Sequence, residues 1–127
     1  MRNVRVLVVD DEQDFREMLS RHLEDKCLQV LTADSGENAL DVLLKSPVDV
    51  VILDVKMPGL SGIETLRWIK KDHPEVEVIM LTGYASLEAS TEGMEFGAFD
   101  YLLKPVDTDI LTYKIQDAAK KKILRDP

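Results

Sequence analysis

The stretch VVILDVKMPG, residues 50–59, decides the fold class that we expect for this chain. It opens with four consecutive apolar residues, which is typical of a strand buried on both faces of a parallel sheet. The run ends at Asp54, and Met57-Pro58-Gly59 then predicts a turn. A buried strand that ends on a carboxylate indicates that the carboxylate has a role at the end of the sheet.

Short apolar segments of this kind recur along the chain and alternate with amphipathic segments. We expect strands at 4–10, 28–33, 49–54, 76–81 and 99–104, and helices at 12–26, 35–45, 62–72, 85–96 and 107–124. Strict alternation with short connections predicts a parallel sheet covered by helices on both faces. Three strands are the most continuously apolar and are expected at the centre. The predicted fold is therefore a flavodoxin-like, doubly wound (βα)5 sheet of the α/β class, with strand order 2-1-3-4-5.

Length and composition limit the classes of protein. The 127 residues suffice for one domain with a core, so we expect a single domain over 1–127, with 120–127 as a solvated helix end or the start of a linker. A net charge of −8 argues against direct binding to nucleic acid. No apolar run approaches the length of about 20 residues that crosses a bilayer, and no signal peptide is recognisable. We therefore expect no membrane insertion and a cytoplasmic location, which the single cysteine, Cys27, fits.

Reactive side chains close four of the five predicted strands. The first strand ends at Asp10-Asp11, the third at Asp54, the fourth at Thr82 and the fifth at Lys104. Taken alone, each residue is explained by a helix start, a turn, a cap or a surface position. The carboxyl ends of parallel strands share one edge, and ligands bind there where the strand order reverses. We therefore expect these five side chains to form one pocket.

Three carboxylates in one pocket repel one another unless a cation lies among them. Oxygen ligands suit a hard ion such as Mg²⁺. No histidine or cysteine is placed for a softer metal, since His22 and His73 fall on a helix and in a helix-ending loop. A carboxylate, a hydroxyl, an ammonium and Mg²⁺ together serve phosphoryl transfer, in which the carboxylate attacks phosphorus and the cations neutralise the phosphoryl oxygens.

Four segments of the chain strongly resemble the receiver domain of bacterial two-component response regulators. They are VVDDE (8–12), ILDVKMPGLSG (52–62), MLTGYAS (80–86) and YLLKP (101–105), in the order and spacing of that family. The resemblance implies that Asp54 accepts a phosphoryl group from a phosphohistidine of a sensor histidine kinase or a phosphotransfer protein. It also implies that Asp11, Asp54 and the backbone carbonyl of Lys56 bind Mg²⁺, with Asp10 acting mainly through water.

The resemblance assigns the remaining site residues as well. Thr82 is expected to bond one phosphoryl oxygen and Lys104 to pair with another, and the Lys104-Pro105 peptide bond is expected to be cis. Tyr101 matches an aromatic residue that swings inward when Thr82 moves. Alternation along 99–104 places Phe99 and Tyr101 on the same face of their strand.

The function expected from these features is a phosphorylation-dependent signalling switch in a phosphorelay, not an enzyme that turns over an external substrate. Residues 85–124 are expected to form the output surface for a downstream output domain or a homodimer. Lys56 and Tyr84, beside the acceptor, are expected to help set the lifetime of the aspartyl phosphate.

Four alternative functions are weighed against this one. They are an excised receiver of a larger transcriptional regulator, a small Mg²⁺-dependent phosphohydrolase, a receiver that acts without phosphorylation, and a nucleotide or flavin module. The phosphohydrolase needs a second acid or base and usually a cap, for which the chain has no room. The intact set of acids argues against a receiver that acts without phosphorylation. The acidic loop DDEQD and the lack of a glycine-rich phosphate motif disfavour the nucleotide module.

Overall fold

The computed structural model of the chain describes residues 3–125, and side chains through residue 122. Its five strands form one parallel sheet in the order β2-β1-β3-β4-β5, which confirms the predicted fold class and strand order. Among the described residues, no helix combines the length and the apolar character needed to span a membrane. In chain order the elements are β1 (Arg5–Val9), α1 (Gln13–Asp25), β2 (Gln29–Ala33), α2 (Gly36–Lys45), β3 (Val50–Leu53), α3 (Gly62–Asp72), β4 (Glu77–Thr82), α4 (Leu87–Glu95), β5 (Asp100–Leu103) and α5 (Thr108–Arg125).

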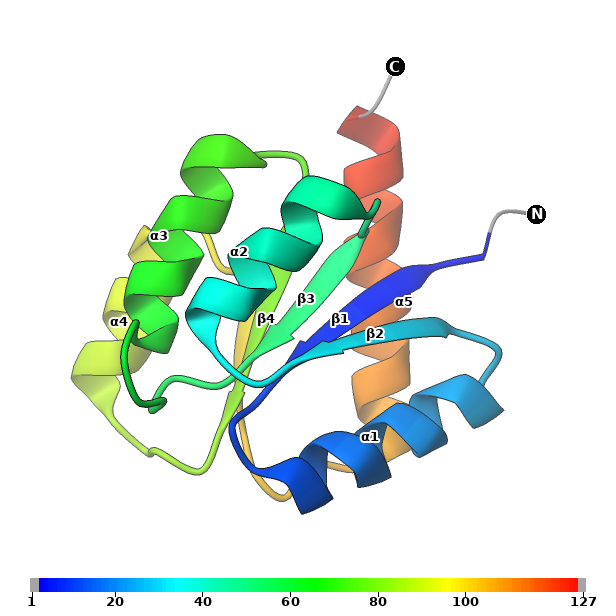
Figure 1. Ribbon diagram of the computed structural model, residues 1–127, viewed down its shortest axis with the longest axis horizontal. Helices are drawn as coiled ribbons and strands as arrows, with labels where there is room; N and C mark the ends of the chain where they lie inside the picture. The colour runs from blue at the N-terminus through cyan, green and yellow to red at the C-terminus, as the bar shows by residue number, and fades with distance from the viewer. Residues whose placement is uncertain (1–2, 126–127) are drawn as a thin grey trace.

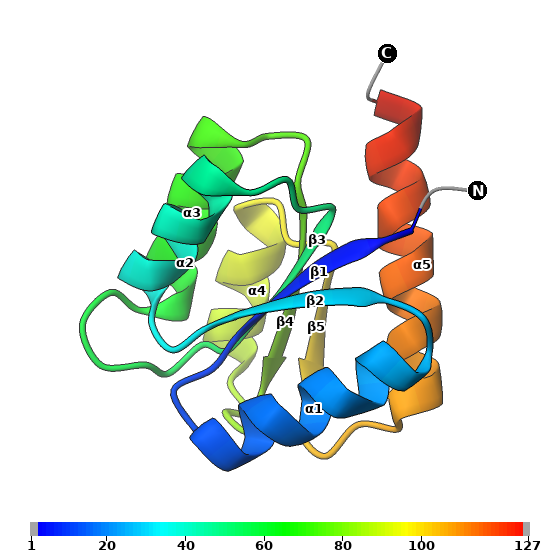
Figure 2. The same cartoon turned by 45° about the vertical axis from the view of Figure 1, so that its right-hand side comes forward.

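Helices α1 and α5 cover one face of the sheet, and α2, α3 and α4 cover the other (Figure 1, Figure 2). The alternation of side chains along each strand decides which residue faces which layer. In β1, Val6 and Val8 pack with α1 and α5, whereas Leu7 and Val9 pack with the opposite layer. Every residue of β3 and β4 is buried, because both faces of these central strands are covered.

Serine caps and one close backbone approach place the helices around the carboxyl edge of the sheet. The side chains of Ser35, Ser61 and Ser86 each accept a hydrogen bond from a backbone N–H three residues later, which caps α2, α3 and α4. Helix α3 begins at Gly62 directly against the end of β3, since a Cβ at Gly62 would overlap the carbonyl oxygen of Asp54. The start of α3 therefore fixes the backbone that carries Asp54.

The lysines near the end of the chain correct one expectation. The side chain of Lys122 is only 9% exposed and its Nζ lies 3.2 Å from a carboxylate oxygen of Asp49, while Lys121 Nζ lies 3.8 Å from Glu77. Both of these carboxylic acids are fully buried at the amino end of the sheet. The last turns of α5 are thus held against the sheet by charge, and Lys122 does not belong to a solvated helix end. Residues 126–127 of the expected linker lie outside the described residues.

Phe99 corrects a second expectation. It packs with Leu102 in the cluster between the sheet and the α1/α5 layer, whereas Tyr101 packs with the opposite cluster. Phe99 precedes the first residue of β5, Asp100, so strict alternation does not extend to it. The two aromatic rings therefore lie on opposite faces of the sheet, not on the same one.

Candidate functional site

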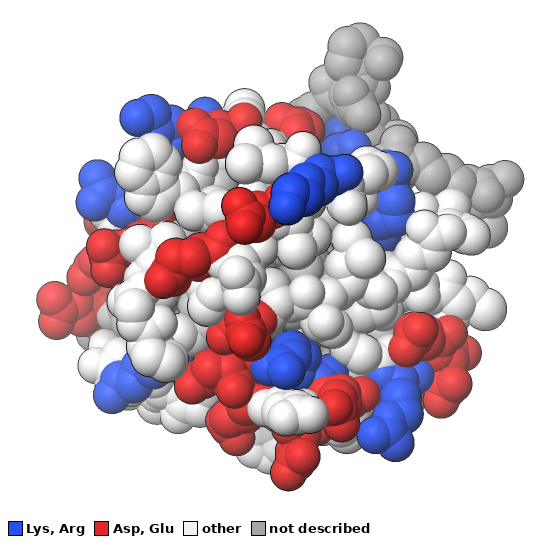
Figure 3. All heavy atoms as spheres, in the orientation of Figure 1, with Lys and Arg blue, Asp and Glu red and all other residues white. Residues whose placement is uncertain are grey.

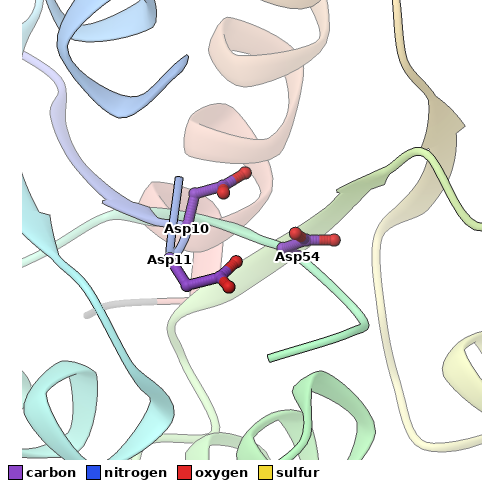
Figure 4. A group of neighbouring side chains, drawn as sticks. All are labelled: Asp10, Asp11 and Asp54. Atoms are coloured by element: carbon purple, nitrogen blue, oxygen red, sulfur yellow. The ribbon is translucent and has the colours of Figure 1, made fainter. Parts of the chain in front are cut away.

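The three predicted acidic residues meet at the carboxyl ends of β1 and β3. Figure 4 shows Asp10 and Asp11, which follow β1, beside Asp54, which follows β3. Each contributes one carboxylate oxygen to a group in which all these atoms lie within 4.8 Å of one another. Asp10 and Asp54 are 2% and 6% exposed, whereas Asp11 is exposed. Acidic side chains also gather along the lower edge of the face drawn in Figure 3, where the loops after these two strands lie.

Lys104 brings a positive charge into this acidic group from the end of β5. Its Nζ donates a hydrogen bond of 2.7 Å to Asp10, and it lies 3.7 Å from Asp54 Oδ2 and 3.8 Å from Glu12. Burial lowers the pKa of Lys104, but the carboxylates of Asp10, Asp54 and Glu12 outweigh it and raise that pKa above its ordinary value. The ammonium therefore stays charged at neutral pH. The Lys104-Pro105 peptide bond is cis, as predicted.

Asp54 is held in one orientation by its neighbours. Its Oδ1 accepts a hydrogen bond of 2.8 Å from the backbone N–H of Val55. Burial raises the pKa of Asp54, and the negative charge of Asp10 raises it further. Hydrogen bonding to Thr82, the charge of Lys104 and the Val55 N–H act in the opposite direction. The site thus holds a buried carboxylate whose second oxygen, Oδ2, lies 3.7 Å from the Lys104 ammonium.

Thr82 and Tyr101 are connected through the loop after β4. The Thr82 hydroxyl accepts a hydrogen bond of 3.1 Å from the backbone N–H of Tyr84. The Tyr101 hydroxyl donates a hydrogen bond of 2.7 Å to the backbone carbonyl of that same residue. Tyr101 is half-buried against the cluster beneath α4. Thr82 and Tyr101 are thus both hydrogen-bonded to the backbone of one loop residue, Tyr84.

An open cavity of about 350 Å³ lies at this edge of the sheet. Across it, Lys56 Nζ lies 4.0 Å from the centroid of the Tyr84 ring. A hollow of about 410 Å³ lies along α3, but the converging acids and Lys104 are absent from its lining, so we take the smaller cavity as the site. The residues that line this site are Asp11, Glu12, Asp54, Lys56, Thr82, Gly83, Tyr84 and Lys104.

The structure brings together all the residues that the sequence placed at this edge, and it adds two. Glu12 lines the cavity, and the ring of Phe15 lies 4.0 Å below Lys104 Nζ. The position of Glu12 directly after Asp10-Asp11 was a usable signal, whereas nothing in the sequence connects Phe15 with a lysine at the end of the fifth strand. His22 and His73 do not line the cavity, as expected.

Comparison with known proteins identifies the family. The family model of the response regulator receiver domain matches residues 6–116. The chain belongs to this family. As a receiver domain it is a signalling domain of two-component systems, and the role of a phosphorylation switch fits it.

Relatives of two lengths match this receiver. Sporulation initiation phosphotransferase F of Bacillus subtilis (strain 168) is 37% identical over 121 residues, which are 95% of this chain and 94% of that protein. Regulatory protein AtoC of Escherichia coli (strain K12) is 35% identical over 95% of this chain, but the receiver spans only 26% of its length. A response regulator receiver domain protein from Clostridium thermocellum superposes with a TM-score of 0.91 at 40% identity, over 96% of this chain and 98% of that one.

The acidic group fits the divalent cation that receiver domains generally bind. All of its donors are carboxylate oxygens, and they lie close enough to share one ion. Hard oxygen donors of this kind suit Mg²⁺, which binds through one or two carboxylates and keeps its other positions for water or phosphate. The exposure of Asp11 leaves the group open to solvent on one side, where such ligands can enter.

Proposed function

We propose that this receiver is a phosphorylation-driven switch and that Asp54 is its phosphoacceptor. The observation that carries the proposal is the position of Asp54. It is buried at the end of β3, yet it lines an open cavity together with Thr82 and Lys104. A buried carboxylate beside a hydroxyl and an ammonium is suited to accept a phosphoryl group.

The two oxygens of Asp54 have different environments, which suggests which one reacts. Oδ1 is held by the Val55 N–H, whereas Oδ2 is the oxygen near Lys104 Nζ. We assign the attack to Oδ2. Its bond to phosphorus forms as the phosphorus–nitrogen bond of the donor phosphohistidine breaks, and the imidazole nitrogen keeps the electron pair. Burial and the negative charge of Asp10 raise the pKa of Asp54, which makes its carboxylate a better nucleophile than that of an exposed aspartate.

Asp10, Asp11, Asp54 and the backbone carbonyl of Lys56 would hold Mg²⁺, whose contribution is to neutralise charge on the phosphoryl oxygens. Lys104 supplies a second positive charge near Asp54. To pair with a phosphoryl oxygen its ammonium has to shift from Asp10, at 2.7 Å, toward Asp54, at 3.7 Å. Attack of water on the same phosphorus returns the free carboxylate and inorganic phosphate. The chain therefore catalyses its own phosphorylation and slow dephosphorylation and is not a turnover enzyme.

The switch follows from the connection between Thr82 and Tyr101. When the Thr82 hydroxyl turns to a phosphoryl oxygen, the backbone of Tyr84, whose N–H is hydrogen-bonded to that hydroxyl, moves with it. The Tyr84 carbonyl, which accepts the hydrogen bond from Tyr101, is displaced as well. Helix α4 follows easily, because only Ala89 and Gly93 of this helix are buried. The signal then reaches the surface formed by α4, β5 and α5.

That surface is the proposed contact with partners. It exposes the large apolar side chains of Leu87, Leu103, Ile110 and Tyr113, a group suited to burial against an output domain or in a homodimer. The upstream partner is a sensor histidine kinase or a phosphotransfer protein. Downstream we propose an output domain, as the greater length of AtoC suggests, or onward transfer of the phosphoryl group, as the name of sporulation initiation phosphotransferase F suggests. We place either form in the cytoplasm, without direct contact to nucleic acid.

Labelling with a small phosphodonor tests the proposal. With acetyl phosphate and Mg²⁺ the wild-type chain is expected to acquire one acid-stable, hydroxylamine-labile phosphoryl group, and Asp54→Asn to acquire none. Asp72→Asn, which removes an exposed carboxylate at the end of α3, is the matched control and is expected to label normally. Stoichiometric labelling of Asp54→Asn would place the acceptor elsewhere, and rapid multiple turnover of the donor would favour a phosphohydrolase.

A further inference from the structure

The ammonium of Lys104 has two kinds of neighbour. The carboxylates of Asp10, Asp54 and Glu12 lie 2.7–3.8 Å from its Nζ. The same Nζ also lies over the ring of Phe15, 4.0 Å from the ring centroid. We propose that Phe15 is a positioning residue for phosphoryl transfer, because its ring holds the Lys104 ammonium over the cavity between Asp10 and Asp54. This inference rests on the proposed function and assigns it a residue that lies outside the acidic cavity.

The ring and the ammonium are arranged for a cation–π interaction. A lysine within about 6 Å of a ring centroid is attracted to the negative face of the ring, and the attraction is stronger where water is excluded. Only 15% of the Lys104 side chain is exposed, so the pair is partly desolvated. Interactions of this size shift an equilibrium by about 2- to 30-fold.

Phe15 is fixed relative to the acids, so its ring cannot follow the lysine away. It lies near the start of α1 and packs against the apolar cluster between the sheet and the α1/α5 layer. The next residue, Arg16, donates a hydrogen bond of 2.8 Å to the backbone carbonyl of Asp10, and the Glu12 N–H donates one of 2.9 Å to the Asp10 carboxylate. The ring and Asp10 thus belong to one rigid unit, against which the long Lys104 side chain is held.

This restraint bears on the reaction because a free lysine side chain has many rotamers. Restricting the side chain to one rotamer costs conformational entropy. Contact with the ring makes this restriction before the reaction begins, so the transfer step does not have to overcome that cost. The aromatic face blocks the path of Nζ toward α1 without offering a strong hydrogen-bond acceptor. The ammonium stays among the carboxylates of Asp10, Asp54 and Glu12, within reach of a phosphoryl group that arrives on Asp54.

Ring removal with a matched control tests the inference. Phe15→Leu and Phe15→Met remove the ring and keep an apolar side chain, whereas Phe15→Tyr keeps the ring. Phe99→Leu is the control, since Phe99 packs against the same cluster but lies at the opposite end of β5. The measurements are the rate constant of phosphorylation by acetyl phosphate with Mg²⁺ and the midpoint of urea unfolding for each protein.

We expect Phe15→Leu to be phosphorylated about 2- to 30-fold more slowly than wild type and Phe15→Tyr to stay within about twofold. Phe99→Leu should lose stability but keep the wild-type rate. If Phe15→Leu does not fold, Phe15→Met replaces it in the test and is expected to show the same decrease in the phosphorylation rate. Equal rates for the Phe15→Leu and Phe99→Leu variants, or a tyrosine variant as slow as the leucine one, would overturn the inference while Asp54 labelling stands. A wild-type chain that takes no label at Asp54 would overturn the proposed function and this inference with it.

Discussion

Removal of the Asp49 carboxylate should destabilise the chain in a manner that depends on pH. Asp49 is fully buried just before β3, far from the acidic cavity. Arg5 donates three hydrogen bonds to it, of 2.9, 3.1 and 3.2 Å, and Lys122 lies 3.2 Å away. Burial alone would raise the pKa of Asp49, but the hydrogen bonds from Arg5 and Lys122 outweigh burial and lower that pKa from 3.8 to about 2.

The size and sign of the effect follow from this pKa. The folded state binds the proton of Asp49 less tightly than the unfolded state, so the ionised carboxylate stabilises the fold. This stabilisation is complete above pH 3.8 and is lost as the pH falls to about 2. Each tenfold change in proton affinity corresponds to about 1.4 kcal/mol, which gives about 2 kcal/mol for Asp49. An asparagine also removes the buried negative charge that Arg5 and Lys122 contact, so the total cost at pH 7 is expected to be about 2–5 kcal/mol.

Urea unfolding of wild type, Asp49→Asn and Asp41→Asn between pH 7 and pH 2 measures the effect. The difference between wild type and Asp49→Asn should be constant from pH 7 to 5 and should then shrink by about 2 kcal/mol toward pH 2. Asp41 is exposed on α2, so its variant should stay within about 0.5 kcal/mol of wild type throughout. A difference that does not change with pH, or an Asp49→Asn protein as stable as wild type, would refute the reasoning.

Three further outcomes are expected at the site. Saturating Mg²⁺ should raise the free energy of unfolding by about 1–3 kcal/mol, and Asp11→Ala should raise it in the absence of Mg²⁺. Both changes relieve the repulsion among the three carboxylates. A midpoint of urea unfolding that neither change shifts would contradict this. Lys56→Asn and Tyr84→Ala should each change the hydrolysis rate of the phosphorylated protein, since the two side chains meet across the cavity; unchanged phosphate release would show that they do not control water. Gly62→Ala should cost about 1–3 kcal/mol, because its Cβ would overlap the backbone of the acceptor strand, whereas Gly83→Ala has open space and should cost little in a thermal unfolding assay.

Much of this receiver could be predicted from sequence because the controlling signals are local. Apolar runs and helix-ending prolines placed every element to within two residues of its observed ends. The rule that parallel strands share one carboxyl edge then brought Asp10, Asp54, Thr82 and Lys104 together without any knowledge of side-chain contacts. The two failures lie at the limits of elements, where neither alternation nor helix periodicity decides the environment of a side chain. Phe99 precedes the first residue of β5, and Lys122 lies in the last turn of α5.

The sequence by itself determined the fold class, the strand order and the identity of the groups at the carboxyl edge, since each depends on patterns within about ten residues of the chain. The tertiary structure alone decided which groups pair. It placed Lys104 on Asp10 rather than on Asp54, across 94 residues of sequence, and set the Phe15 ring against it. It also buried Lys122 on Asp49. These contacts depend on how α1 and α5 pack on one face of the sheet. That packing brings residues that are far apart in sequence to within 3–4 Å of one another, and no local sequence pattern encodes it.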